Sequence, residues 1–301
     1  MNINKKNRFV FILCCLFWMA STAQTSPNSD TTITYKPDFS FIDFLISNAE
    51  FEDALLLLKT SSNHKVNQDQ SLYDSLNYYT GIVYYNIKRL DSSVVYFEKV
   101  NAGSPFYIKS KFYENFEHIY MGQYELADKK MQKINITDST LMELNRFQRG
   151  TSALLQADFN RFDDIGKSFT YNNFACAEEQ RELFKRREEL LQNKKKSPLL
   201  AGLMSAIIPG SGKFYAGYRG QAISSMFPTL IFAATAAETY YRAGPKSVQF
   251  IAAASLFSIF YVGNIWGSVL SVKTFYEIRN NEIRNNIMLD LHIPLRRIFS
   301  N

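Results

Sequence analysis

Gly122-Gln123-Tyr124-Glu125-Leu126-Ala127 is the clearest copy of a pattern that decides the fold of this chain. The pattern is a small or polar residue, any residue, an apolar ring or Leu, an acid, any residue and a mostly small residue. It recurs as AEFEDA at 49–54, KRLDSS at 88–93 and, more weakly, NRFDDI at 160–165. The apolar positions 51, 90, 124 and 162 are 39, 34 and 38 residues apart. Such self-similarity indicates an array of helical repeats.

Each copy predicts a tight turn followed by a new helix. The acid at 52, 91, 125 or 163 then lies in the first turn, where a negative charge faces the positive end of the helix dipole. Apolar residues follow at helical spacing, as at Val94, Phe97 and Val100. Small residues let two helices approach closely, so we expect close crossings at Gly81 and Ala127.

The composition agrees with an all-α fold. Aromatic residues make up 15% of the 301 residues, which excludes a wholly disordered chain. Gly and Pro number only 13 and 8, which argues against a turn-rich β protein. The three Cys are too few for a disulfide-built scaffold.

The repeats resemble the tetratricopeptide repeat. In the second unit, Gly81, Tyr84, Phe97 and Pro105 fall where that family has its Gly, Tyr, aromatic and closing Pro. The third unit keeps the small residue at Ala127, and the family's Trp is absent. The resemblance covers roughly residues 38–168 and implies a solenoid of antiparallel helix pairs, which we assign to a domain at 36–170.

The family also implies a concave face lined by the first helix of each pair. Position by position, that face would form a peptide groove for a protein or peptide partner. An alternative stays open, in which these rings pack between repeats as core. The candidate groove residues are Tyr78, Ile82, Tyr85, Phe112, Phe116 and Ile119.

The N-terminus predicts an export signal at 1–23. Lys5, Lys6 and Arg8 precede an apolar run at 9–20, and small residues follow at 21–23. An uncleaved anchor is the alternative. We expect an exported chain with this signal to belong to a bacterial cell envelope. We expect an integral protein of the inner membrane, although the outer membrane is an alternative. The repeats would lie outside the cytoplasm.

The C-terminal third predicts a membrane module. A charged helical linker at 171–198 ends in Lys194-Lys195-Lys196 before Pro198. The membrane domain at 199–272 begins with a half-helix at 199–208, too short to span the bilayer. Apolar segments at 222–241 and 248–272 have the length of a transmembrane hairpin, and a basic surface helix and tail follow at 273–301.

A glycine-rich corner joins the half-helix to the first span. Lys213 follows Gly212, but the spacing and the residue after it do not fit a phosphate-binding loop. The segment resembles a motif of small two-helix bacterial membrane domains and implies a tight turn at the membrane interface. Gly263 and Gly267 on the second span could pack the hairpin or a second copy of the chain. The corner motif comprises Pro209, Gly210, Gly212, Tyr215, Gly217 and Gly220.

Two topologies compete. An exported repeat domain followed by two spans leaves the basic tail outside, against the positive-inside rule. Three spans would satisfy that rule but would put Gly210 to Lys213 inside the bilayer, where a charge is costly. We therefore favour two spans.

Chemical motifs are absent from the sequence. His64, His118 and His292 are far apart, and no nucleophile, zinc or nucleotide signature occurs, so we expect no enzyme, cofactor or metal. Residues 24–170 carry 15 basic and 19 acidic residues, while 171–301 carry 16 and 9, so the basic excess flanks the apolar segments. That placement favours membrane lipid over nucleic acid. We expect a membrane-anchored protein-interaction scaffold, or alternatively a small transport or lipid-handling component.

Overall fold

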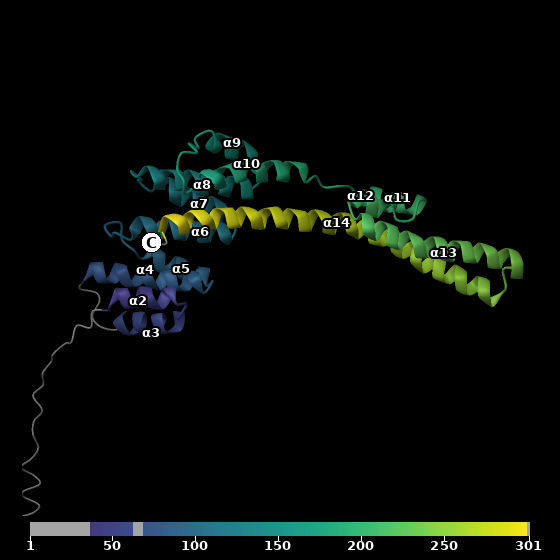
Figure 1. The fold of residues 1–301 in the computed structure, drawn as a ribbon, viewed down its shortest axis with the longest axis horizontal. Helices are drawn as coiled ribbons and strands as arrows, with labels where there is room; N and C mark the ends of the chain where they lie inside the picture. Colours follow the sequence, from purple (N-terminus) through teal and green to yellow (C-terminus); the bar gives the residue numbers. More distant parts are fainter. Residues whose placement is uncertain (1–36, 63–68, 300–301) are drawn as a thin grey trace, which may run out of the picture.

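The computed structural model describes residues 37–62 and 69–299, and within them the chain is all-helical. Figure 1 shows a helical body at one end, from which α13 and α14 extend as a narrow arm. The predicted export signal at 1–23 and His64 lie outside the described residues. Thirteen helices, α2 to α14, are present in the described ranges.

The body begins with eight helices in which each contacts the next along the chain. This confirms consecutive helix pairs as the principle of the fold. The pairs are α2 (Phe39–Ser47) with α3 (Phe51–Ser62), α4 (Gln70–Asn86) with α5 (Leu90–Glu98), α6 (Tyr107–Tyr120) with α7 (Tyr124–Gln132), and α8 (Ser139–Leu155) with α9 (Phe159–Gly166).

The turn inside each pair has the same backbone conformation. Ala49, Lys88, Gly122 and Ala157 have φ values of 60°, 64°, 77° and 59°. The residue after each of them donates its N–H to the carbonyl five positions earlier, as Asp158 does to Ala153 at 3.0 Å. This is the left-handed helix ending that usually calls for glycine, and three of the four positions use other residues.

The common turn corrects the predicted register of the fourth copy. Helices α3, α5 and α7 begin at 51, 90 and 124 and carry an acid in the first turn, as predicted. Helix α9 begins at Phe159, so the placement of Asp163 in a first turn is wrong. Asp158 caps this helix instead, accepting a hydrogen bond from Arg161 N at 3.1 Å. The real unit starts three residues earlier than the sequence pattern placed it.

Close packing within the pairs follows from small residues. A Cβ atom added at Gly81 would lie 2.6 Å from the ring of Phe97, so α4 and α5 approach too closely for a side chain there. Ala127 on α7 is fully buried. The body core around them is rich in aromatic rings, among them Phe97, Phe112, Phe147 and Phe162, which are all fully buried.

The segment expected as a charged linker joins the body. Helix α10 (Ala177–Gln192) packs against α8 and α14, and its Leu183 is fully buried. The ring of Phe184 lies 5.0 Å from that of Phe162. Only residues 193–197 remain as a connection to the apolar part.

The predicted transmembrane hairpin is not confirmed as such. After α11 (Pro198–Ile207), α12 (Ser211–Ala216) and α13 (Arg219–Ala243) comes one helix, α14 (Val248–Phe299), of 52 residues. In the described ranges α14 is the one helix both long and apolar enough to cross a membrane. Helix α13 packs along it but falls short in hydropathy, since it carries several hydroxyl side chains and Glu238.

The tail expected on the surface is part of that same helix and enters the body. The C-terminal part of α14 packs against α6, α8 and α10 (Figure 1). Four apolar side chains on this stretch are almost completely buried: Ile283, Ile287, Leu291 and Leu295. The body therefore includes both a segment that precedes the apolar arm and one that follows it.

The shared turn gives a matched pair of tests. Ala157→Gly should raise the free energy of unfolding by about 0.5–1 kcal/mol, because glycine adopts a positive φ without the steric cost that a Cβ brings. Gly122→Ala should lower it by about 1 kcal/mol for the opposite reason. Both positions are exposed, so packing is unaffected. Denaturant unfolding of the purified variants measures both values, and equal effects of the same sign would contradict the shared conformation.

Candidate functional site

The predicted groove residues lie together on the first helices of the second and third pairs. Tyr78, Tyr85, Phe112, Phe116 and Ile119 are each at most 5% exposed, and Ile82 is partly buried. Tyr78 stacks on Phe106, with 4.4 Å between ring centroids, and so packs between pairs. The other rings face a segment that sequence reasoning had placed elsewhere.

That segment is the end of α14. The His292 ring lies 5.9 Å from the ring of Tyr85 and 5.3 Å from that of Phe116. The Phe299 ring lies 5.7 Å from that of Phe112. The aromatic face that was predicted to receive a partner peptide thus holds a helix of its own chain.

Charged side chains form hydrogen bonds and ion pairs between this helix and three parts of the body. Arg284 donates to the carbonyl of Leu155 at 2.7 Å and to the Tyr124 hydroxyl at 2.6 Å. Arg186 on α10 pairs with Asp290 at 3.4 Å. Arg297 pairs with the buried Glu179 at 3.1 Å and also donates to the carbonyls of residues 174 and 175. Each end of the inserted stretch is held by an arginine.

Sequence reasoning missed the insertion although a signal was present. Ile283, Ile287, Leu291 and Leu295 recur every four residues, which places them along one stripe of a helix. An apolar stripe on a helix indicates a buried face. The high charge of the neighbouring residues, including Arg296 and Arg297, had suggested a surface helix.

The inserted helix leaves an opening beside the aromatic face. A pocket of about 630 Å³ remains beside it, between α6 and α14. Its apolar lining includes Phe116, Tyr120, Leu155 and Leu289, and Tyr120 and Leu289 are 59% and 61% exposed. Lys88 and Arg284 lie at its rim. We call this opening, lined by residues of α5 to α8 and of α14, the groove pocket.

A second cluster resembles a metal site but contains a lysine. Glu98, Glu114 and His118 offer ligand atoms within 4.8 Å of one another. Lys130 Nζ donates to both carboxylates, 2.5 Å from Glu98 Oε1, and lies 3.2 Å from His118 Nε2. Burial alone would raise the pKa of Glu114, but hydrogen bonds from His118, Lys111 and Lys130 outweigh it and lower that pKa to about 2. The ammonium group already supplies the positive charge, so these residues form a partly buried ion-pair network and do not fit a metal.

Glu117, one turn away from Tyr113 on α6, has no such partner. Its side chain is fully buried and neither carboxylate oxygen accepts a hydrogen bond. Burial raises its pKa to about 9, so the carboxyl is protonated at neutral pH. The Tyr85 hydroxyl and His292 Nε2 are also buried without a partner. Polar atoms without partners therefore gather where the inserted helix meets the repeats.

The corner motif has a structural explanation at most of its positions. Pro209 lies in the turn between α11 and α12, and Gly210 has a φ of 89°. A Cβ at Gly212 would lie 2.0 Å from the carbonyl of Ala201, so only glycine fits where α12 meets α11. Gly217 also has a positive φ. A Cβ at Gly220 would meet no atom within 4 Å, so packing does not explain that glycine.

Gly263 and Gly267 on α14 do not pack closely against α13. A Cβ at Gly263 would meet nothing within 4 Å, and one at Gly267 would touch the side chain of Lys213. The inner side of the arm also contains polar contacts. Ser205 and Ser268 share a hydrogen bond of 2.7 Å, and Ser225 donates to Asn264 at 3.4 Å.

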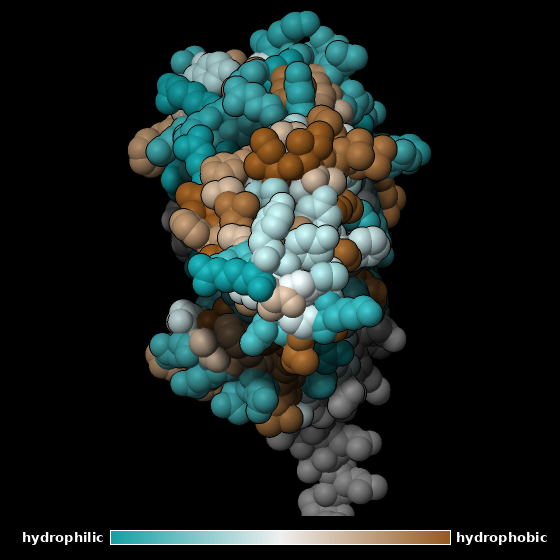
Figure 2. Space-filling view, turned by 90° about the vertical axis from the view of Figure 1, so that its right-hand side faces the viewer, coloured by the Kyte–Doolittle hydropathy of each residue, from teal (hydrophilic) through white to brown (hydrophobic). Residues whose placement is uncertain are grey.

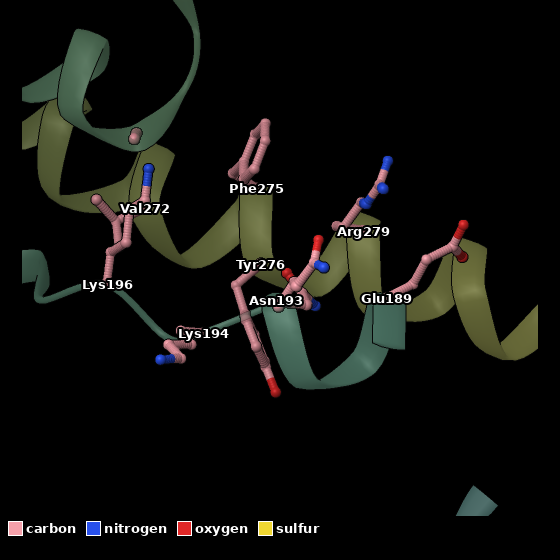
Figure 3. Close-up of a pocket in the computed structure, with 10 residues that line it drawn as sticks. Glu189, Asn193, Lys194, Lys196, Val272, Phe275, Tyr276 and Arg279 are labelled. Carbon is pink, nitrogen blue, oxygen red and sulfur yellow. The ribbon is translucent and has the colours of Figure 1, made fainter. Parts of the chain in front are cut away.

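A further pocket lies at the junction of body and arm. It has a volume of about 270 Å³. Figure 3 shows Asn193, Lys194 and Lys196 of the connection together with Phe275, Tyr276 and Arg279 of α14 around it. Tyr215 of the corner motif lies beside it, where Lys196 donates to its carbonyl at 2.6 Å and its hydroxyl accepts from Ser197 N at 3.2 Å.

The Glu117 carboxyl predicts a dependence of stability on pH. Its pKa rises from the ordinary 4.5 to about 9 on folding, so the folded protein keeps a proton that the unfolded chain loses in this range. Stability should fall as pH rises from about 5 to 9, with a slope approaching about 1.4 kcal/mol per pH unit.

Glu117→Gln should flatten this fall between pH 7 and 9, because glutamine has no carboxyl proton to lose. Melting temperatures in detergent measure the effect, and Glu125→Gln, at an exposed position, is the control. Identical pH profiles for wild type and Glu117→Gln would show that the carboxyl is not held protonated.

Comparison of this chain with protein-family models, with curated proteins and with solved structures gives no match in any of the three.

Proposed function

We propose that this chain is a non-enzymatic scaffold of a bacterial cell envelope, anchored in a membrane by its apolar arm and binding a protein partner with its helical body. The body would be a tetratricopeptide-like array, in keeping with its consecutive helix pairs.

The exposed apolar surface of the arm carries this proposal. Trp266 and Ile259 on α14 are 67% and 66% exposed, and Phe227 and Ile231 on α13 are more than half exposed. Figure 2, which looks onto the end of the arm, shows brown hydrophobic side chains at the surface beside teal polar ones. Apolar patches of this extent are unfavourable in water, and lipid would cover them.

The course of the chain favours an even number of crossings. The arm leaves the body after α10 and returns to it through α14. A stretch of 25 residues, as in α13 or from 248 to 272, is about 37 Å long, enough for a hydrocarbon layer of about 30 Å. If α14 crosses once, α13 is the neighbouring helix long enough to supply the other crossing.

The groove pocket is the surface we assign to the partner. Most of the aromatic face is covered by α14, but Tyr120 and Leu289 stay exposed beside basic Lys88 and Arg284. Aromatic anchors with a polar rim are typical of protein interfaces. A peptide with an apolar side chain next to an acidic one suits this lining.

The alternative, a transport or lipid-handling component, has less support. Asn264 does face the inside of the arm, 3% exposed and with its amide nitrogen unpartnered. Glu238, however, is paired with Arg242 on the outside. The serines between α11 and α14 bond to each other and serve packing.

Co-purification from native membranes tests the scaffold. Tagged wild type should retain a specific protein that Tyr120→Ala with Leu289→Ala loses by about tenfold or more, as for truncated interface anchors. The control pair is Leu56→Ala with Val95→Ala, which are similarly exposed on other helices. Equal recovery by both pairs would remove the groove pocket as the partner site.

Labelling of single cysteines in intact cells tests the topology. Cys14 and Cys15 are replaced by Ser, and the buried Cys176 stays. Lys59→Cys on the body and Ile293→Cys on the tail should react alike with an impermeant maleimide, and Lys246→Cys at the tip of the arm should show the opposite access. Different access of the body and tail positions would require an odd number of crossings.

A further inference from the structure

We propose that the junction between body and arm binds the phosphate group of an anionic phospholipid. The proposal rests on the membrane anchoring argued above and names the lipid class that the anchor prefers. The sites involved are the connection 193–197, the start of α13 and residues 273–279 of α14.

Cationic side chains without counter-ions gather at this level of the molecule. Within the described residues, Lys194, Lys195, Lys196, Arg219 and Lys273 are exposed and form no ion pair. Elsewhere in the body, Lys130, Arg149 and Arg186 are examples of basic residues bound to carboxylates, although other exposed lysines there also form no ion pair.

Negative groups at the junction are few. Arg279 has its nearest carboxylate, Glu282, at 3.8 Å. Glu189 on the pocket wall is already engaged by Arg186, and Glu277 is exposed. The excess of positive charge is therefore available to a ligand.

Aromatic rings accompany the cations. Lys196 Nζ lies 5.3 Å from the ring centre of Tyr215, and Lys195 Nζ lies 5.1 Å from that of Tyr276. Tyr218 packs edge-on against Phe275. Tyrosines beside lysines are typical of the headgroup layer, where a ring has one apolar and one wet side.

The position of the junction along the arm fits the headgroup layer of a bilayer. It lies one helix length, about 37 Å, from the tip of the arm at 244–247, so both ends of the arm reach the two surfaces of one bilayer. Its pocket has an apolar floor of Ala216, Val272 and Phe275, with Asn193, Lys194 and Arg279 among its polar walls (Figure 3). Asn193 Nδ2 is buried there without an acceptor. A phosphate oxygen supplies the acceptor and the charge, and the floor accommodates the first acyl carbons.

Native mass spectrometry of the delipidated full-length protein in detergent tests the proposal. Phosphatidylglycerol and phosphatidylcholine with the same chains are added at equal concentration. Wild type should bind the anionic lipid in excess, and Lys194→Gln with Lys195→Gln and Lys196→Gln should lower the ratio by about tenfold, because three positive charges that attract the lipid phosphate are lost.

Two further variants make the result specific. Lys273→Gln with Arg279→Gln removes charge from the α14 side and should lower the ratio even if the first variant folds poorly. Lys59→Gln with Lys129→Gln and Lys133→Gln removes the same charge as the first variant from exposed positions on the body and should leave the ratio unchanged.

The outcomes separate the alternatives. Equal ratios in wild type and both junction variants overturn the proposal, and so does displacement of the lipid by glycerol phosphate at equal concentration, which would indicate a site for soluble phosphate. If wild type is absent from the membrane fraction of cells, the anchoring itself has failed. Membrane-bound wild type without a preference for the anionic lipid refutes only the present inference.

Discussion

The packing of residues 283–295 into the helical body is the interaction on which the rest of the structure depends. It buries a row of four apolar side chains against helices that lie far earlier in the chain. Burial of a large aliphatic side chain contributes about 1.5–3 kcal/mol, so these four side chains make a large contribution to the stability of the body core. It also fixes the arm, because both connections between arm and body are then anchored.

Local patterns accounted for the helices but not for the contact that joins the two ends of the molecule. The turns at 49, 88 and 122 were visible because a ring or Leu and an acid follow each of them. The turn at Ala157 was missed by three residues, because Phe159 and Phe162 both fit the apolar position and the acid next to Phe162 attracted the assignment. What distinguishes the two is a positive φ at Ala157, and alanine is not a residue type that indicates one.

The candidate site likewise depends on contacts between distant parts of the sequence, which local patterns do not predict. Three of the six residues predicted to line a groove, Tyr85, Phe112 and Phe116, contact a helix from the far end of the chain. The spacing of Ile283 to Leu295 indicated that this helix has a buried face, but no spacing says against which surface. Likewise, Glu114 and His118 lie one turn apart on α6, but Glu98 comes from α5 and Lys130 from α7, and only folding brings these to them.

The continuity of α14 has a mechanical consequence. A helix is stiff over several turns, and this one runs without interruption from the apolar arm to the aromatic face of the helix pairs. Its inserted part, from 272 to 299, is about 40 Å long, so a tilt of about 10° at the bilayer surface would displace its far end by about 7 Å. If the arm spans a bilayer as proposed, α14 acts as a lever with its pivot at the headgroup layer. Changes in bilayer thickness or lateral pressure would then strain the contacts of His292 and Phe299, far from the lipid.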